Sequence, residues 1–247
     1  MKSFTLISAL LFAAFAVHAQ KSGVVPASAK QQPAVNDTLF EKDPSNPDHV
    51  FLSVMNGKGI LTTKGELLKG KRDGIWRTFN DKGNILSLEQ FRMGQKNGVV
   101  YGFSNNGMVN LEENYRNNQL DGQKIIYNSS GRIKMLETYS KGILHGEKKT
   151  FYDDGKLQEE SFYKNGQRDG ICRWYLTTEK VSIEYTYVNG SLDGPAREYD
   201  ATGSLKREGV YKKNNEDGEW KEYSDAKPLK TIIYKDGVIV KEIPAKN

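Results

Sequence analysis

One glycine-led stretch returns seven times in this chain of 247 residues, always at the same interval. Its first copy is residues 73–79, Asp-Gly-Ile-Trp-Arg-Thr-Phe, and the lead glycine then recurs every 24 residues without insertion or deletion. The seven lead glycines are Gly74, Gly98, Gly122, Gly146, Gly170, Gly194 and Gly218. A fixed period in this range is typical of repeat architectures, in which each period is one supersecondary unit.

Aromatic residues recur at two fixed offsets from the lead glycine. The first set lies five positions after it: Phe79, Phe103, Tyr127, Phe151, Tyr175, Tyr199 and Tyr223. The second set lies seventeen positions after it: Phe91, Tyr115, Tyr139, Tyr163, Tyr187 and Tyr211. Both sets fall in short segments that suit strands, and Gly- and Asn-containing turn sequences separate these segments. The pattern predicts an all-β fold: an elongated, twisted antiparallel meander of seven 24-residue β-hairpin repeats.

The spacing also predicts which residues face one another. If strands pair through the turns, Phe79 lies opposite Ile85 and Phe91 lies opposite Val99. Alternation along the strands then places both aromatic sets on one face of the sheet and Trp76 on the other. We expect the lead glycines to be structural turn glycines with positive φ, a conformation that glycine adopts readily.

The chain divides into four predicted segments. Residues 1–19 combine a short basic start, an apolar stretch and small residues before a cleavage point, so we expect a signal peptide. Its apolar stretch is shorter than the roughly 20 residues that span a bilayer, so no transmembrane span is expected after cleavage. Residues 20–49 are predicted to be a flexible leader, 50–70 a degenerate N-terminal cap hairpin, and 71–247 the seven repeats with a C-terminal cap strand. The predicted location is the periplasm, the cell envelope or the medium.

Charge and cysteine content exclude several classes of partner and site. The formal net charge is +5, and basic residues are scattered without a run of four, so we expect no nucleic-acid partner. The single Cys172 rules out an intrachain disulfide framework and a thiolate zinc site. Because it occupies the repeat position held by Trp76 and Trp220, we expect a packed small hydrophobe rather than a nucleophile.

No catalytic or cofactor-binding motif is found, and His18, His49 and His145 are widely separated in the sequence. The recurrent Asp-Gly pairs supply one carboxylate per turn, whereas calcium needs six to eight converging oxygens. We therefore predict no catalytic residue, no metal site and no cofactor.

The repeat resembles a known family. Residues 74–79 and 218–223, with the turn sequence of residues 163–166, are similar to the MORN-repeat variant of bacterial YwqK-type proteins. The resemblance spans residues 71 to about 240 and departs where tryptophan is replaced by Val100, Lys124, Lys148, Cys172 and Ala196. It implies the hairpin fold. Such repeats occur in proteins described as antitoxins or immunity partners, and related repeats serve as scaffolds or lipid-proximal modules.

The aromatic sets can stack on one another as a substitute for a core, and they can also form a binding platform. Tyrosine dominates the later units, so the candidate binding surface is Tyr175, Tyr187, Tyr199, Tyr211 and Tyr223. We expect an exported, non-enzymatic repeat scaffold that binds a protein or an envelope polysaccharide or lipid surface along its sheet. The alternative is an immunity or antitoxin-type protein that neutralises a single toxin partner.

Overall fold

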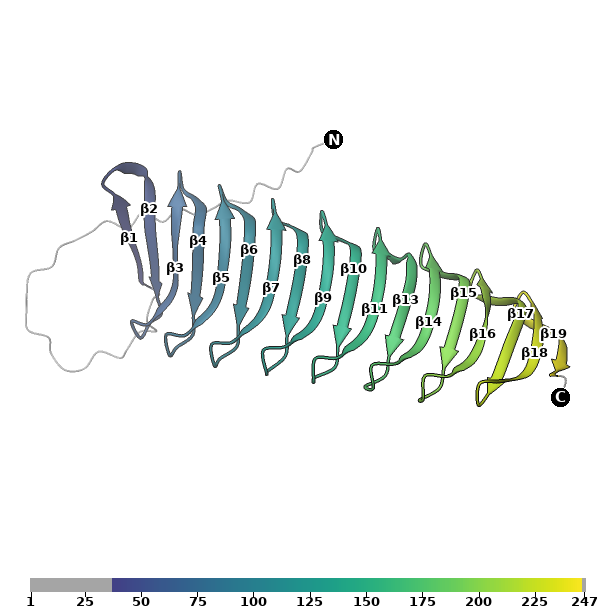
Figure 1. Cartoon of the computed structure of the whole chain (residues 1–247). Helices are drawn as coiled ribbons and strands as arrows, with labels where there is room; N and C mark the ends of the chain where they lie inside the picture. Colours follow the sequence, from purple (N-terminus) through teal and green to yellow (C-terminus); the bar gives the residue numbers. More distant parts are fainter. Residues whose placement is uncertain (1–36, 246–247) are drawn as a thin grey trace, which may run out of the picture. The chain divides into compact units, whose positions relative to one another are not determined.

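The computed structural model describes residues 37–245, and the regular structure in this range is a single antiparallel β-sheet without helices (Figure 1). Strands pair with their neighbours in chain order, except that β12 and β13 both pair with β11, and the sheet stays open with β1 and β19 at its edges. The strands are β1 (Asp37–Asp43), β2 (Asn46–Met55), β3 (Leu61–Leu68), β4 (Lys71–Phe79), β5 (Ile85–Arg92), β6 (Gln95–Phe103), β7 (Val109–Arg116), β8 (Gln119–Tyr127), β9 (Ile133–Ser140), β10 (Ile143–Phe151), β11 (Leu157–Lys164), β12 (Gln167–Arg168), β13 (Gly170–Tyr175), β14 (Val181–Val188), β15 (Ser191–Tyr199), β16 (Leu205–Lys212), β17 (Asn215–Ser224), β18 (Lys227–Lys235) and β19 (Val238–Pro244). The predicted all-β hairpin meander is confirmed.

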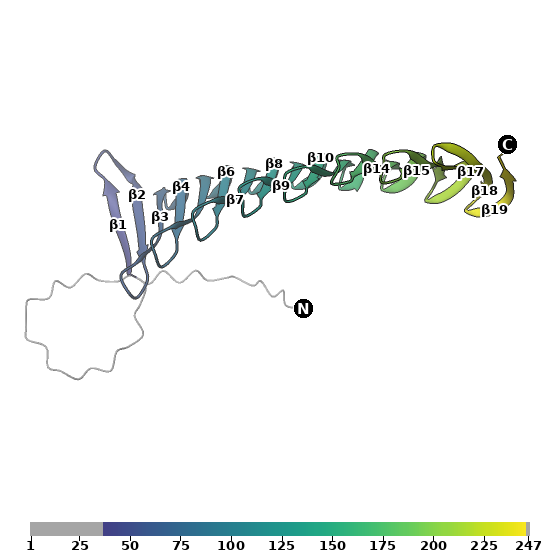
Figure 2. The same cartoon turned by 60° about the horizontal axis from the view of Figure 1, so that its bottom comes forward.

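Two-residue turns join one repeat to the next (Figure 2). In the turn between β11 and β12, Asn165 has φ 53° and Gly166 has φ 81°. Positive φ at both central residues is the requirement of the type I′ turn, whose twist matches that of the strands it joins. Where Asn118 replaces the glycine, its φ is 67° and its side chain accepts a 2.7 Å hydrogen bond from the Lys96 amide.

The lead glycines lie inside strands, not in these turns. Gly98 is within β6 and has φ 120°. There the ladder shifts: Val100 pairs with Glu89 and Lys96 pairs with Phe91, so three residues of β6 face one residue of β5. The positive φ predicted for the lead glycines is present in all seven, between 67° and 130°. The positive φ arises because each lead glycine lies in a β-bulge, where the backbone takes a conformation that glycine adopts most readily.

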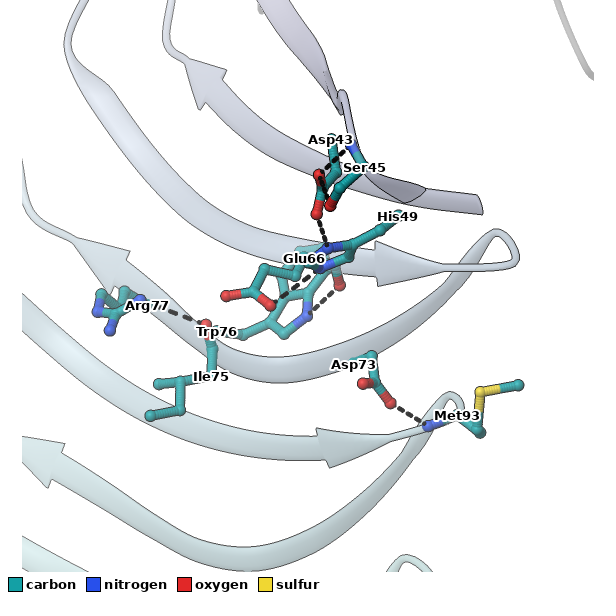
Figure 3. A network of polar contacts seen from close by, with 9 residues as sticks. All are labelled: Asp43, Ser45, His49, Glu66, Asp73, Ile75, Trp76, Arg77 and Met93. Atoms are coloured by element: carbon teal, nitrogen blue, oxygen red, sulfur yellow. Dashed lines mark hydrogen bonds and ion pairs between the residues drawn. The ribbon is translucent and has the colours of Figure 1, made fainter. Parts of the chain in front are cut away.

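The residue before the lead glycine ties neighbouring repeats together. Asp73 accepts a 2.8 Å hydrogen bond from the backbone amide of Met93, in the next turn along the sheet (Figure 3). Asp169 does the same for Asn189, at 3.2 Å. The Asp or Asn that precedes most lead glycines therefore has a structural role at the turn-bearing edge of the sheet.

The predicted register is correct in the first pair and wrong in the second. Phe79 lies opposite Ile85, as expected, but Phe91 pairs with Lys96 and not with Val99. The two-residue turn at Met93 and Gly94 accounts for the difference, because it places Arg92 opposite Gln95 and Phe91 opposite Lys96 before the bulge is reached.

The two aromatic sets lie on opposite faces, which corrects the prediction that they share one. Tyr115, from the second set, donates a hydrogen bond to Glu113, whereas Tyr127, from the first set, donates to Glu112. Glu112 and Glu113 are consecutive in β7, so their side chains point to opposite sides of the sheet. We call the side that carries Glu113 face A and the side that carries Glu112 face B.

Trp76 belongs to face A together with the second aromatic set. Its ring lies 6.3 Å from that of Phe91 in an edge-to-face arrangement. Trp220 repeats this position at the other end of the sheet and lies 5.0 Å from Tyr211. The prediction that Trp76 and Phe91 point to different faces is therefore wrong, and the tryptophans pack with the second aromatic set.

Most of the buried side chains lie in one row along face A, while Phe91 and Tyr234 flank this row on the same face and Ile125 is buried on face B. Each member lies opposite the next on the neighbouring strand, and the row contains Gly65, Trp76, Glu89, Val100, Glu113, Lys124, Glu137, Lys148, Ser161, Cys172, Tyr185, Ala196, Gly209, Trp220 and Ile232. Cys172 and Trp220 are fully buried and Ala196 is 1% exposed. Burial of Cys172 agrees with its prediction as a packed residue.

Neighbours in this row are complementary in size or charge. The Trp220 ring covers Gly209, where an added Cβ would lie 2.2 Å from the indole, and Trp76 covers Gly65 in the same way. Each indole N–H also donates a 3.1 Å hydrogen bond to a backbone carbonyl of the preceding strand. In the middle repeats lysine replaces tryptophan, and Lys148 lies 3.1 Å from the buried Glu137 carboxylate. Where another residue replaces tryptophan at this repeat position, its partner on the neighbouring strand therefore complements it in size or charge.

The sheet begins earlier than expected and ends as expected. β1 and the start of β2 fall in residues 37–49, which the sequence analysis assigned to a flexible leader. β2 and β3 form the predicted cap hairpin, but β1 pairs outside it and is the edge strand. β19 pairs with β18 and supplies the predicted C-terminal cap strand. The predicted signal peptide, residues 1–19, and residues 20–36 of the predicted leader lie outside the described residues.

Within residues 37–245, no helix is long and apolar enough to cross a membrane.

Replacing Gly146 by valine should lower the melting temperature, because a β-branched residue is strained at the φ of 112° that this bulge imposes. The expected strain is about 1–3 kcal/mol. In a chain of this size, each kcal/mol of lost stability lowers the melting temperature by about 2–4 °C. Thr150→Val, a nearly isosteric change on the same strand, is the control. Equal melting temperatures for the two variants in a calorimetric scan would contradict the requirement for positive φ.

Gly209→Ala should destabilise the fold by about 1–3 kcal/mol, since the new methyl group must displace the Trp220 indole from a packed position. Gly102→Ala is the matched control: it also lies within a strand, but its added Cβ would first meet the mobile Asn110 side chain amide. Urea denaturation gives both free energies of unfolding. If Gly102→Ala lowers the free energy of unfolding as much as Gly209→Ala does, the result would argue against close packing of the Trp220 indole on Gly209.

Candidate functional site

Face B of the C-terminal half carries a continuous row of ion pairs. The row alternates in charge across strands β10 to β16 and consists of Lys149, Glu160, Arg173, Glu184, Arg197 and Glu208. Arg173 and Arg197 both contact the Glu184 carboxylate, with N–O distances of 2.7 and 2.9 Å. The outer contacts of the row are longer, at 3.5 to 3.7 Å.

The repeat itself produces this row. The cations lie three positions after a lead glycine, and each glutamate lies opposite a cation on the returning strand. Opposite charges in directly facing positions stabilise antiparallel pairs. The hydrogen bond to Glu184 raises the pKa of Arg173 above its ordinary value, so this guanidinium stays charged. The row is therefore electrically balanced and holds neighbouring hairpins in register.

Three of the five candidate tyrosines lie on face B beside this row. They are Tyr175, Tyr199 and Tyr223, and all three rings are half-buried. Tyr223 donates a 2.8 Å hydrogen bond to Glu208, which raises its pKa, and Tyr175 donates a 3.4 Å bond to Glu160. Two of these hydroxyls are thus engaged in hydrogen bonds within the chain.

The other two candidates, Tyr187 and Tyr211, lie on face A. Tyr187 lies beside the Arg168 guanidinium, 5.5 Å from its ring centre, and Tyr211 packs edge-on against Trp220. Burial raises the pKa of both hydroxyls. The structure therefore separates the candidate set: two tyrosines belong to the core row of face A and three line face B.

Arg168 and Arg207 were missed by the sequence analysis. Arg207 stacks 4.1 Å above the Trp220 ring and bonds to the Tyr234 hydroxyl at 3.1 Å, while Arg168 lies 5.3 Å above Trp174. Guanidinium groups pack well on aromatic faces. Arg168 lies two positions before a lead glycine, as do Arg72 and Lys96, whose cations also lie over aromatic rings, so this period could have indicated it. Arg207 has no counterpart of this kind in the other units, and only the folded sheet shows that it covers the aromatic core.

An exposed apolar row completes face B. It follows the positions next to the lead glycine and their cross-strand partners, and contains Phe162, Ile171, Pro195 and Val210. Phe162 is 39% exposed, Ile171 41% and Val210 44%, and a shallow groove runs past Pro195 and Val210 toward Lys221. Thr186 of β14 lies opposite Ile171 and separates Phe162 and Ile171 from Pro195 and Val210, so the row consists of two apolar pairs. Exposed apolar side chains beside charged ones are typical of protein-binding surfaces.

Groups suited to metal binding do not assemble in the described part of the chain: residues 37–245 contain no cluster of three or more His, Cys, Asp or Glu that could hold an ion. His49 and the adjacent carboxylates of Asp43 and Glu66 do not converge, since the two carboxylates contact opposite ring nitrogens.

Comparison with known proteins identifies the repeat unit. Residues 144–165 and 192–213 match the family model described as the MORN repeat variant. A comparison with curated proteins gives no match. Each matched stretch covers one hairpin, β10 with β11 and β15 with β16, and the same bulge and turn geometry continues through the units between and around them. The chain is therefore a β-hairpin repeat protein in which two hairpins are similar to the MORN repeat variant.

Proposed function

We propose that this chain is an exported, non-enzymatic repeat scaffold that binds a protein partner along face B of its C-terminal half. The observation that carries the proposal is the exposed apolar row of Phe162, Ile171, Pro195 and Val210 beside the balanced ion-pair row. Monomeric proteins rarely leave contiguous apolar surface open to water without a use for it. Export rests on the signal-peptide pattern of residues 1–19.

The physical design of face B suits such a role. Its charges are already paired within the chain, so the cations and carboxylates are held in fixed positions before a partner arrives. Fixed side chains lose little conformational entropy on binding. Repeat arrays also present extended surfaces in place of deep pockets, which favours an elongated contact over a small-molecule site.

The observations favour a protein over an envelope polysaccharide as the partner. Sugar recognition would need open aromatic rings, whereas the rings of Tyr175, Tyr199 and Tyr223 are half-buried. The exposed groups of the apolar row are largely aliphatic, and they match the apolar centre of a protein interface. The similarity of two hairpins to the MORN repeat variant, which occurs in proteins described as antitoxins or immunity partners, is consistent with a protein ligand.

Ile171→Asp should abolish recovery of the partner when the mature chain, from Gln20 onward, is used as bait in an envelope extract of the native organism. A charge introduced into the centre of an apolar contact costs binding energy because it must be desolvated. Ile75→Asp is the control, since Ile75 occupies the same repeat position in the N-terminal half and is 43% exposed, against 41% for Ile171.

Recovery of one stoichiometric protein that is lost only with Ile171→Asp would support the proposal and would favour neutralisation of a single partner over a general scaffold. Recovery of several proteins lost in the same way would favour the scaffold. Recovery of wall polysaccharide or lipid, or equal recovery by both variants, would contradict binding of a protein at face B.

A further inference from the structure

The N-terminal edge of the sheet contains a three-residue polar cluster that the proposed function does not use. His49 of β2 lies between two carboxylates that come from the strands on either side of it (Figure 3). Its Nδ1 atom lies 3.2 Å from Asp43 of β1, and its Nε2 atom lies 3.1 Å from Glu66 of β3. The imidazole thus connects three successive strands through side chains.

Only one protonation state of the ring satisfies both contacts. An ionised carboxylate accepts hydrogen bonds and cannot donate them, and a neutral imidazole carries a single N–H. A neutral His49 can therefore bond to Asp43 or to Glu66, whereas the imidazolium can donate to both at once. The positions of the two carboxylates therefore favour the protonated form of His49.

The surrounding charges reinforce this selection. On β1, Glu41 occupies the position opposite Phe51, whose ring lies 4.8 Å from that of His49, and on β4, Asp73 lies opposite Glu66. On this face, Lys71 of β4 lies opposite Leu68, which pairs with His49, and Lys64 lies two residues before Glu66 on β3; both lysines are exposed. Asp48 adjoins His49 in β2, and Lys42 and Arg72 project to the other face by alternation along their strands. Acidic groups therefore outnumber basic ones around the ring.

The cluster acts on the N-terminal edge strand of the sheet. β1 pairs on one side only, with β2, and six of its seven residues are exposed. Its ladder is irregular between Lys42 and Asp43, at the end where the cluster lies. Asp43 is itself fixed by Ser45, whose amide and hydroxyl donate at 2.8 and 2.7 Å. A bond from His49 to Asp43 therefore anchors the end of β1 that the backbone ladder holds least well.

We propose that His49 is a pH-sensitive clamp that holds the edge strand β1 against the sheet when the ring is protonated and loosens it when the proton is lost. Loosening β1 uncovers the backbone edge of β2, which is then free to pair with another strand. The clamp thereby couples the pH of the surrounding compartment to the accessibility of one end of the repeat array.

The direction of the pH dependence follows from the two partners. The hydrogen bond with Asp43 raises the pKa of His49 above its ordinary 6.5, so its stabilising contribution is complete below about 6.5 and is lost as the pH rises through the higher folded value. The pKa of Asp43 is lowered to about 2, first by the side-chain hydrogen bond from Ser45, so this carboxylate is ionised throughout that range. The contribution of Asp43 is lost only when the pH falls toward that value.

Amide hydrogen exchange of the mature chain at pH 5.5 and 8.5, with each rate divided by that of the unstructured peptide, tests the clamp. The corrected exchange rate of the β1 amides should increase by about two- to fivefold at the higher pH, as expected for the loss of a partly exposed ion pair. Strands β10 and β11 provide the internal reference. His145→Gln, which alters a histidine without a carboxylate contact, should retain this increase, and His49→Gln should remove it.

A wild-type β1 with the same corrected exchange at both pH values, or a His49→Gln variant that keeps the increase, would overturn the proposal. His49→Gln also removes the packing on Phe51 and could therefore free β1 at both pH values. In that case, NMR titration of the His49 ring in the wild type tests the clamp. Its midpoint should lie above 6.5 in the wild type and should fall in Asp43→Asn. A wild-type midpoint at or below 6.5 would contradict the clamp.

Discussion

Complementarity between facing side chains along one row of face A is the constraint on which the rest of the sheet depends. A single-layer sheet has no second layer to cover its core, so each buried side chain must be covered by its cross-strand neighbours. Trp220 fits over Gly209, Lys148 neutralises the buried Glu137, and Cys172 packs where a tryptophan would not fit beside Tyr185. Each repeat is thereby matched to the one before it.

The two faces exchange character near β10. Before it, the central row of face A is ionic around Glu113 and Lys124, and the facing positions on face B include the apolar Ile125 and Leu136. After it, the central row of face A becomes largely apolar, with the Arg168–Glu159 and Arg207–Glu216 ion pairs beside it, and the central row of face B becomes ionic. On both sides of β10 the partly buried charges of the central rows are paired, which avoids burying an unpaired charge. This exchange also places the balanced ion-pair row and the exposed apolar row together on one C-terminal surface.

The turn and bulge geometry allows this matching to continue across seven units without drift. The type I′ turns close each unit with a fixed twist, and the bulge at each lead glycine resets the register before the next strand. Because both devices recur every 24 residues, equivalent side chains form straight rows along the sheet. The functional consequence is a surface of fixed spacing, with an edge strand at the N-terminal end that His49 anchors.

The sequence by itself determined the period, the hairpin unit, the positive φ of the lead glycines, the pairing of Phe79 with Ile85 and the C-terminal cap strand. These features depend on local chemistry, namely turn residues, glycine conformations and strand-forming segments, which a linear pattern records directly. The tertiary structure alone decided the faces. A one-residue bulge at the end of the first strand of each unit, such as the one between Thr78 and Phe79, shifts the ladder by one residue. It therefore separates Tyr187 and Tyr211 from Tyr175, Tyr199 and Tyr223 and places Trp76 on the same face as Phe91. Contacts between strands, such as Arg207 on Trp220 and His49 between Asp43 and Glu66, depend on which strands become neighbours, and no period in the sequence encodes them.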